Sequence, residues 1–172
     1  MKYIVFLAFT LLVGFSIANA QNITIKKILE LNTLPAVEVV KFLEINNWVY
    51  QQTNIGFLGK ENAHVYSLRD DNFNSECLFI VQEPDSLSLN NVLMYQFFDN
   101  KKYVQLLKET DTLNLKLNPK YSNLKNGIKV FQDGSIVITL VPSPPKTSDR
   151  QYMYQVIVML ETEFDRVVNS IN

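Results

Sequence analysis

Two apolar runs, at residues 92–98 and 152–160, constrain the fold more than any other feature of this sequence, and both contain the tripeptide Met-Tyr-Gln. β-Branched and aromatic residues dominate both runs, and neither contains Gly or Pro, which is typical of strands. Because each run is apolar or aromatic apart from one Gln, each predicted strand needs cover on both faces. We therefore expect both strands in the centre of a sheet.

Apolar residues recur at helical spacing in four segments, near residues 24–31, 33–45, 99–110 and 161–172. Thr24 and Thr33 are expected N-caps of the first two segments. The second segment has the clearest pattern, with Pro35 in its first turn and apolar residues at i, i+3, i+4 and i+7, namely Ala36, Val39, Val40 and Leu43. These patterns predict a small number of amphipathic helices.

Strands are predicted between the helices, and they outnumber them. The strand patterns cover residues 48–53, 63–69, 77–82, 113–117, 128–132 and 135–141, besides the two apolar runs. Asp133-Gly134 suits a two-residue hairpin turn in which both central residues take positive φ. Runs of strands with few helices between them predict an α+β fold. We expect a mainly antiparallel sheet of about six to eight strands, with two or three helices packed on one face.

The order of the predicted elements repeats. Residues 24–98 and 99–160 each give a helix, several strands and a closing apolar strand, and residues 161–172 add a helix. One shared tripeptide is expected by chance in a chain of this length, so Met-Tyr-Gln alone does not establish a repeat. A single domain over residues 21–172 is expected. An internal duplication and an ordinary α+β meander both stay open as its origin.

Residues 1–20 predict a secretory signal peptide. Lys2 precedes an apolar run over residues 3–17, and Ala18-Asn19-Ala20 places small residues where a signal peptidase reads them. The alternative is a membrane anchor, but the run is shorter than the ~20 residues that cross a bilayer. We expect cleavage after Ala20, no membrane span after it, and a location in a periplasm or outside the cell.

Charge and cysteine content exclude two further classes. The formal net charge is −1, and the lysines come singly or in pairs, whereas a nucleic-acid-binding protein needs a basic surplus on one face. The single cysteine, Cys77, excludes an intramolecular disulfide. Because Cys77 lies in an apolar run, it is predicted to be a buried thiol that packs as a small hydrophobe and not a reactive nucleophile.

Motifs for catalysis and for cofactor binding are absent from the sequence. It has no Gly-rich phosphate loop, no nucleophile elbow and no pair of histidines at zinc spacing. His64 is the only histidine, so a nucleophile pair would have to combine it with Cys77. A histidine satisfied by its neighbours in a strand is the commoner case. No cofactor is expected.

One acidic segment partly matches a calcium loop. Asp70, Asn72 and Asn74 alternate as the first ligands would, but Ser75 stands where Gly is needed and Val81 stands where a bidentate Glu is needed. A solvated turn without a metal is the better interpretation. A small exported hydrolase is kept as the alternative function, with His64 or two carboxylates in a cleft, and the acidic candidates are Asp70, Glu76, Glu83 and Asp133.

Aromatic residues and glutamines within the predicted strands suggest binding. The candidates are Trp48, Tyr50, Tyr66, Tyr95, Gln96, Tyr152, Tyr154 and Gln155. Aromatic rings on a sheet face meet a partner as readily as they fill a core, and packing beneath helices is the competing interpretation for most of them. The resulting hypothesis is an exported, non-enzymatic binding or protein-interaction module, whose partner is an unidentified protein or extracytoplasmic ligand.

Overall fold

The computed structural model describes residues 23–57, 60–69, 75–82, 91–123, 126–144 and 152–171. Within them the helices are α2 (Ile25–Asn32), α3 (Ala36–Ile45), α4 (Asn100–Thr112) and α5 (Glu161–Ile171). The strands are β1 (Val49–Phe57), β2 (Lys60–Arg69), β3 (Ser75–Gln82), β4 (Val92–Phe97), β5 (Lys116–Leu117), β6 (Lys129–Asp133), β7 (Ile136–Ser143) and β8 (Met153–Leu160).

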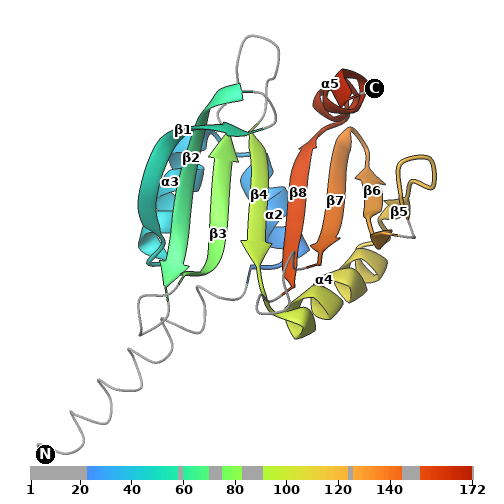
Figure 1. The fold of residues 1–172 in the computed structure, drawn as a ribbon, viewed down its shortest axis with the longest axis horizontal. Coiled ribbons are helices and arrows are strands. Elements are labelled where there is room, and N and C mark those ends of the chain that lie inside the picture. The colour runs from blue at the N-terminus through green and yellow to red at the C-terminus, as the bar shows by residue number, and fades with distance from the viewer. Residues whose placement is uncertain are drawn as a thin grey trace, which may run out of the picture.

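All eight of these strands form one antiparallel sheet (Figure 1), in the order β1-β2-β3-β4-β8-β7-β6-β5. The α+β prediction is therefore confirmed. Each half of the chain contributes a four-strand meander, and the two Met-Tyr-Gln strands, β4 and β8, lie side by side in the centre. The strand order is thus symmetric about the β4–β8 pair, while a common origin of the halves stays a prediction.

Three helices cover one face of the sheet. In Figure 1, α2 and α3 pass behind the strands. Ile25, Ile28 and Leu31 line one side of α2 and are almost completely buried against the strands. Residues from α3 and α4 join the same cluster, which includes the fully buried Phe79 of β3. The main hydrophobic core therefore lies between these helices and the sheet.

Helix α5 packs on the opposite face. Its Phe164 and Val168 contact a cluster that contains Val137 of β7 and Met159 of β8. In Figure 1, α5 stands at one end of β7 and β8. This face of the sheet is therefore covered at one end by the closing helix that the sequence predicts.

The hairpin between β6 and β7 turns one residue later than predicted. Asp133 still pairs with Ile136, so the two turn residues are Gly134 and Ser135 and not Asp133 and Gly134. Gly134 has φ of 59°, and Gly127 is the only other described glycine with positive φ. A positive φ at the first turn residue alone is the pattern of a type II′ turn, which favours Gly at that position.

The strand predicted over residues 113–117 is shorter than expected. Helix α4 continues to Thr112, Asn114 takes a left-handed φ of 54°, and β5 is left with Lys116 and Leu117. The Leu115 N–H donates to the Thr110 carbonyl at 3.0 Å. A left-handed Asn that ends a helix in this way satisfies the last carbonyls. Because Leu and polar residues alternate over residues 113–117, the sequence pattern predicted a strand where the helix in fact ends.

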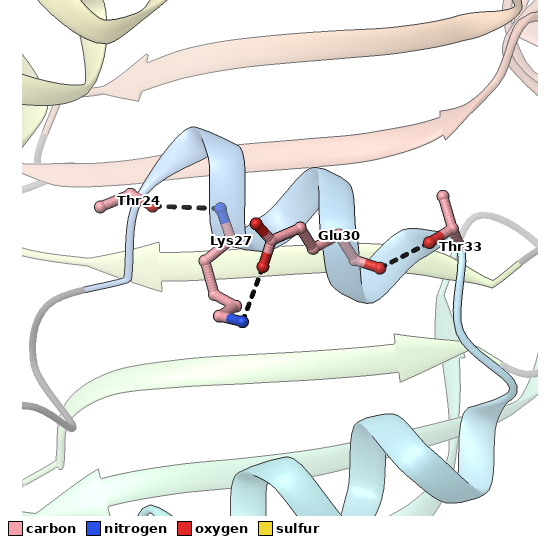
Figure 2. Close-up of polar contacts among 4 residues, drawn as sticks. All are labelled: Thr24, Lys27, Glu30 and Thr33. Carbon is pink, nitrogen blue, oxygen red and sulfur yellow. Dashed lines mark hydrogen bonds and ion pairs between the residues drawn. The ribbon is translucent and has the colours of Figure 1, made fainter.

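Helix α2 is held by local hydrogen bonds at both ends (Figure 2), which matters because eight residues are too few for a helix that is stable alone. The Thr24 hydroxyl accepts the Lys27 N–H at 3.0 Å, which confirms the predicted N-cap. Lys27 also pairs with Glu30. Thr33 is the C-cap of α2 and not the N-cap of α3, because its hydroxyl donates to the Glu30 carbonyl.

Two buried asparagines fasten the α2–α3 junction to the start of β4. The Asn32 amide donates to the Asn91 carbonyl at 2.6 Å, and the Asn91 amide donates to the Leu34 carbonyl at 2.6 Å. Both asparagines are 1% exposed. The two side-chain amides therefore satisfy the backbone carbonyls of Asn91 and Leu34, where the chain changes direction.

Replacing Asn32 with Ala is expected to lower the free energy of unfolding by about 1–3 kcal/mol, because it leaves the buried Asn91 carbonyl without this donor. Urea denaturation followed by circular dichroism measures the change. Thr33→Ala is the control, since Thr33 is exposed and its bond is local, and it should cost less than ~1 kcal/mol. Equal effects of the two substitutions would contradict a fastening role for Asn32.

Candidate interaction surface

Four of the predicted aromatic binding residues lie in the main core. Trp48, Tyr66, Tyr95 and Tyr154 are between 2% and 6% exposed. Trp48 contacts Phe79 and Tyr95 edge to face, with ring centroids 5.8 and 6.2 Å apart. These residues therefore contribute to packing beneath the helices, as the competing interpretation held.

The other two aromatic candidates are exposed but lie far apart in the sheet. Tyr50, on the edge strand β1, is 47% exposed and contacts Tyr66. Tyr152, just before β8, is 51% exposed and stacks on Tyr154. The structure therefore does not gather the tyrosines into one open aromatic site.

Two tyrosines, Tyr154 at the start of β8 and Tyr103 of α4, are held as neutral phenols. Tyr154 donates to the Asn100 side-chain oxygen at 3.0 Å, and its ring stacks on Tyr103. Burial raises the pKa of Tyr103, with a smaller contribution from Tyr154. Burial also raises the pKa of Tyr154, with smaller contributions from Tyr152 and Asp99. At neutral pH these groups act as hydrogen-bonding core residues.

The two candidate glutamines lie on the opposite face and meet each other. Gln96 of β4 pairs with Gln155 of β8 in the sheet register, and the Gln155 Nε2 donates to the Gln96 Oε1 at 3.2 Å. Both side chains are half-buried. The two Met-Tyr-Gln runs therefore come together at their third residue.

This glutamine pair marks a local two-fold axis. In an antiparallel pair of strands, an axis perpendicular to the sheet exchanges residues equally far from the paired positions. The axis exchanges Met94 with Met153 and Phe98 with Ile157. It also exchanges Leu78, the neighbour of Gln96, with Val141, the neighbour of Gln155. The axis therefore relates residues of similar chemical character: Met to Met, Phe to Ile and Leu to Val.

These residues form a continuous patch that we call the glutamine-pair surface. Six of its members are half-buried, Phe98 is 37% exposed, and Met94 is buried. Its members are Leu78, Met94, Gln96, Phe98, Val141, Met153, Gln155 and Ile157. In Figure 1 this is the face of β3, β4, β8 and β7 turned toward the viewer, and no described helix crosses its middle.

The described positions around the patch are uncharged, and all of them except Thr139 and Ser143 are buried within the chain. No Asp, Glu, Lys or Arg occupies the positions of β2, β3, β4, β7 and β8 that point to this side within the described side chains. Besides the patch, they are Ala63, Val65, Ser67, Ile80, Gln82, Val92, Val137, Thr139, Ser143 and Met159. An antiparallel sheet face that meets only water alternates to polar and charged residues. This face does not.

The catalytic candidates are separated. His64 pairs with Val81, whereas Cys77 pairs with Leu68, so the two pairs are four residue steps, or about 13 Å, apart along β3. Cys77 is 4% exposed in the main core, as predicted for a packing thiol. His64 is half-buried beside Tyr50. His64 and Cys77 therefore do not form a nucleophile pair.

The acidic candidates are only partly described. Asp70, Asn72, Asn74 and Glu83 lie outside the described residues, as does the side chain of Glu76. Asp133 is exposed and borders an open hollow of about 620 Å³ beside β5, whose lining also includes Lys116. The described residues contain no group of three or more metal-binding side chains. The hydrolase alternative stays a prediction.

Comparison with known proteins gave no relative. No family model matches the chain, and neither the curated proteins nor the solved structures contain a match. The predicted signal peptide over residues 1–20 lies outside the described residues. Among the described helices, none is long and apolar enough to span a membrane.

Proposed function

We propose that this chain is an exported, non-enzymatic protein-interaction module and that the glutamine-pair surface binds its partner. The observation that carries the proposal is the cluster of half-exposed Leu, Val, Met and Ile side chains and the exposed Phe98 on β3, β4, β8 and β7, with no charged residue among these described members. Such a surface resembles the core of a protein interface, where charged residues are depleted and Met and aromatic residues are enriched. Export rests on the predicted signal peptide, with its Ala18-Asn19-Ala20 cleavage pattern.

The chemistry of the patch indicates the kind of partner. An uncharged surface leaves a charged partner residue without a counter-ion and costs its desolvation. The glutamine pair offers amide N–H donors and carbonyl acceptors inside an apolar rim. The matching partner is therefore a protein surface that is apolar, uncharged and supplies acceptors and donors at its centre.

A photo-crosslinking amino acid at Met153 tests this proposal. Met153 is half-buried on the patch, and Lys41 is an exposed residue of α3 on the helix-covered side of the sheet, so Lys41 is the matched control position. We expect a discrete protein adduct from position 153 in the extracytoplasmic fraction, and at least ~10-fold less from position 41. Equal yields from both positions, or only an intramolecular adduct from position 153, would contradict the proposal.

A further inference from the structure

We infer that the open hollow beside β5 binds a short peptide with free termini. The hollow has a volume of about 620 Å³, which lies within the ~300–1,000 Å³ range of small-ligand sites. Its lining is mostly polar and comes from β5, the end of β6 and the turns beside them. None of the lining residues belongs to the glutamine-pair surface, so this inference goes beyond the proposed function and does not depend on it.

The outer edge of β5 offers one unused pair of backbone groups. The Asn118 N–H donates to the Val130 carbonyl at 2.7 Å, so Asn118 and Val130 are a hydrogen-bonded pair. Bonded and non-bonded pairs alternate along an antiparallel ladder, so Leu117 and Phe131 are a non-bonded pair. Because β5 is the last strand of the sheet (Figure 1), the Leu117 N–H and C=O point away from β6, at the edge that lines the hollow.

The residues on either side limit what can pair with this edge. Pro119 has no N–H, and the Leu115 N–H already donates to the Thr110 carbonyl at 3.0 Å. Among residues 115–119, all of which the structure describes, Leu117 is therefore the only one with a free outward N–H. A long strand cannot continue along such an edge. A peptide of two or three residues can make the two backbone bonds that Leu117 offers.

Two opposite charges line the same hollow without pairing. Lys116 and Asp133 are both exposed, and neither side chain has a hydrogen-bond or ion-pair partner within the described part of the chain. A peptide with free termini carries one carboxylate and one ammonium group. Lys116 then binds the carboxylate and Asp133 binds the ammonium, while Leu117 bonds the backbone between them.

A nuclear magnetic resonance titration of the isotope-labelled protein, as recovered from the producing cells, tests the inference with trialanine as the probe. We expect the amide signals of Lys116 and Leu117 to shift, with a dissociation constant of roughly 0.1–10 mM, because contacts to exposed charges are weak. N-Acetyl-trialanine amide keeps the peptide groups but lacks both charges, and it should bind at least ~3-fold more weakly. L-Alanine keeps both charges but has no peptide group, and it should also bind more weakly than trialanine.

Leu117→Pro is the sharpest variant, because it removes the outward N–H without removing a bond of the β5–β6 ladder. It should abolish the shifts that trialanine causes, and thermal unfolding checks that the variant is folded. Lys116→Met and Asp133→Asn should each weaken binding about 2- to 5-fold, and they decide the question if the proline variant does not fold. Lys108→Met is the control, because Lys108 is an exposed lysine of α4 outside the hollow, and it should leave binding unchanged.

Three results would overturn the inference. The first is an absence of shifts at the hollow with about 10 mM trialanine. The second is equal binding of trialanine and either of the other two probes. The third is wild-type affinity in both charge variants. Each of these results leaves the glutamine-pair surface and its crosslinking test unaffected.

Discussion

Replacing Phe79 with Ala is expected to lower the free energy of unfolding by about 3–5 kcal/mol, the largest effect that a single substitution should have on stability here. Phe79 is fully buried on β3 and contacts Trp48 and Tyr95 through ring edges and faces. Removing the ring loses its own burial and leaves a cavity among aromatic side chains that fill the space under α3. Chemical denaturation, monitored by the fluorescence of the single Trp48, measures the change.

The matched control is Phe98→Ala on the neighbouring strand end. Phe98 is 37% exposed and belongs to the glutamine-pair surface, so its removal should cost less than ~1.5 kcal/mol in the monomer. A similar cost for both substitutions would mean that the two faces of the sheet are equally buried, which contradicts the account of an open face.

Replacing Lys102 with Met is expected to raise the free energy of unfolding by about 1–3 kcal/mol at neutral pH. Lys102 of α4 is 8% exposed, and its ammonium group has no hydrogen-bond partner within the described residues. Met fills nearly the same volume without burying a charge. Lys101→Met is the control, because Lys101 is the exposed neighbour on the same helix and its substitution should change stability by less than ~0.5 kcal/mol.

The advantage of Lys102→Met should shrink as the pH rises. Burial lowers the pKa of Lys102 from its ordinary value of 10.5, and Glu109 opposes the shift most strongly. Between the lowered pKa and 10.5, the unfolded chain holds a proton that the folded chain has released. The wild type therefore gains stability as pH rises through that window. If the difference in unfolding free energy between the wild type and Lys102→Met stays constant from pH 7 to pH 10, the buried charge of Lys102 does not destabilise the folded chain.

The raised pKa values of Tyr103 and Tyr154 act in the opposite direction. An acid with a raised pKa keeps its proton in the folded chain after the unfolded chain has lost it, so stability falls as pH rises above 10.0. Both the wild type and Lys102→Met carry these tyrosines. The difference between the two proteins therefore isolates the lysine.

The centre of the sheet was predictable, but the surface was not. The apolar runs predicted two central strands because few polar residues interrupt them, and β4 and β8 are central. Pairing between them depends on contacts 59 residues apart in sequence, and one sequence does not specify a register at that distance. The meeting of Gln96 and Gln155 is therefore a result of the fold.

The aromatic and glutamine residues that the sequence suggested as one binding site lie on opposite faces of the sheet. Neighbouring residues of a strand point to opposite sides, so Tyr95 and Gln96 cannot share a surface, and neither can Tyr154 and Gln155. The tyrosines lie beneath the helices, and the glutamines lie on the open face. The alternation of side chains along each Met-Tyr-Gln strand could have separated the tyrosines from the glutamines. Which of the two faces the helices cover depends on how α2, α3 and α4 pack.

Hydrophobic members of the surface escaped prediction for a related reason. Met153 and Ile157 are apolar residues in an apolar strand, where the sequence pattern indicates only burial. Their half-exposure follows from the packing of α5 at one end of this face, against Val137 and Met159, which leaves the middle without a described helix. The useful signal is the lack of charge among the described half-exposed side chains of β3, β4, β8 and β7, and it appears only once their register is known.

Photo-crosslinking at Met153 tests the central proposal most directly, because it asks whether the half-exposed glutamine-pair surface contacts a protein in the producing cells. We expect a discrete protein adduct at position 153 that is at least ~10-fold stronger than at Lys41. Equal labelling at the two positions would contradict the claim that this face binds a protein.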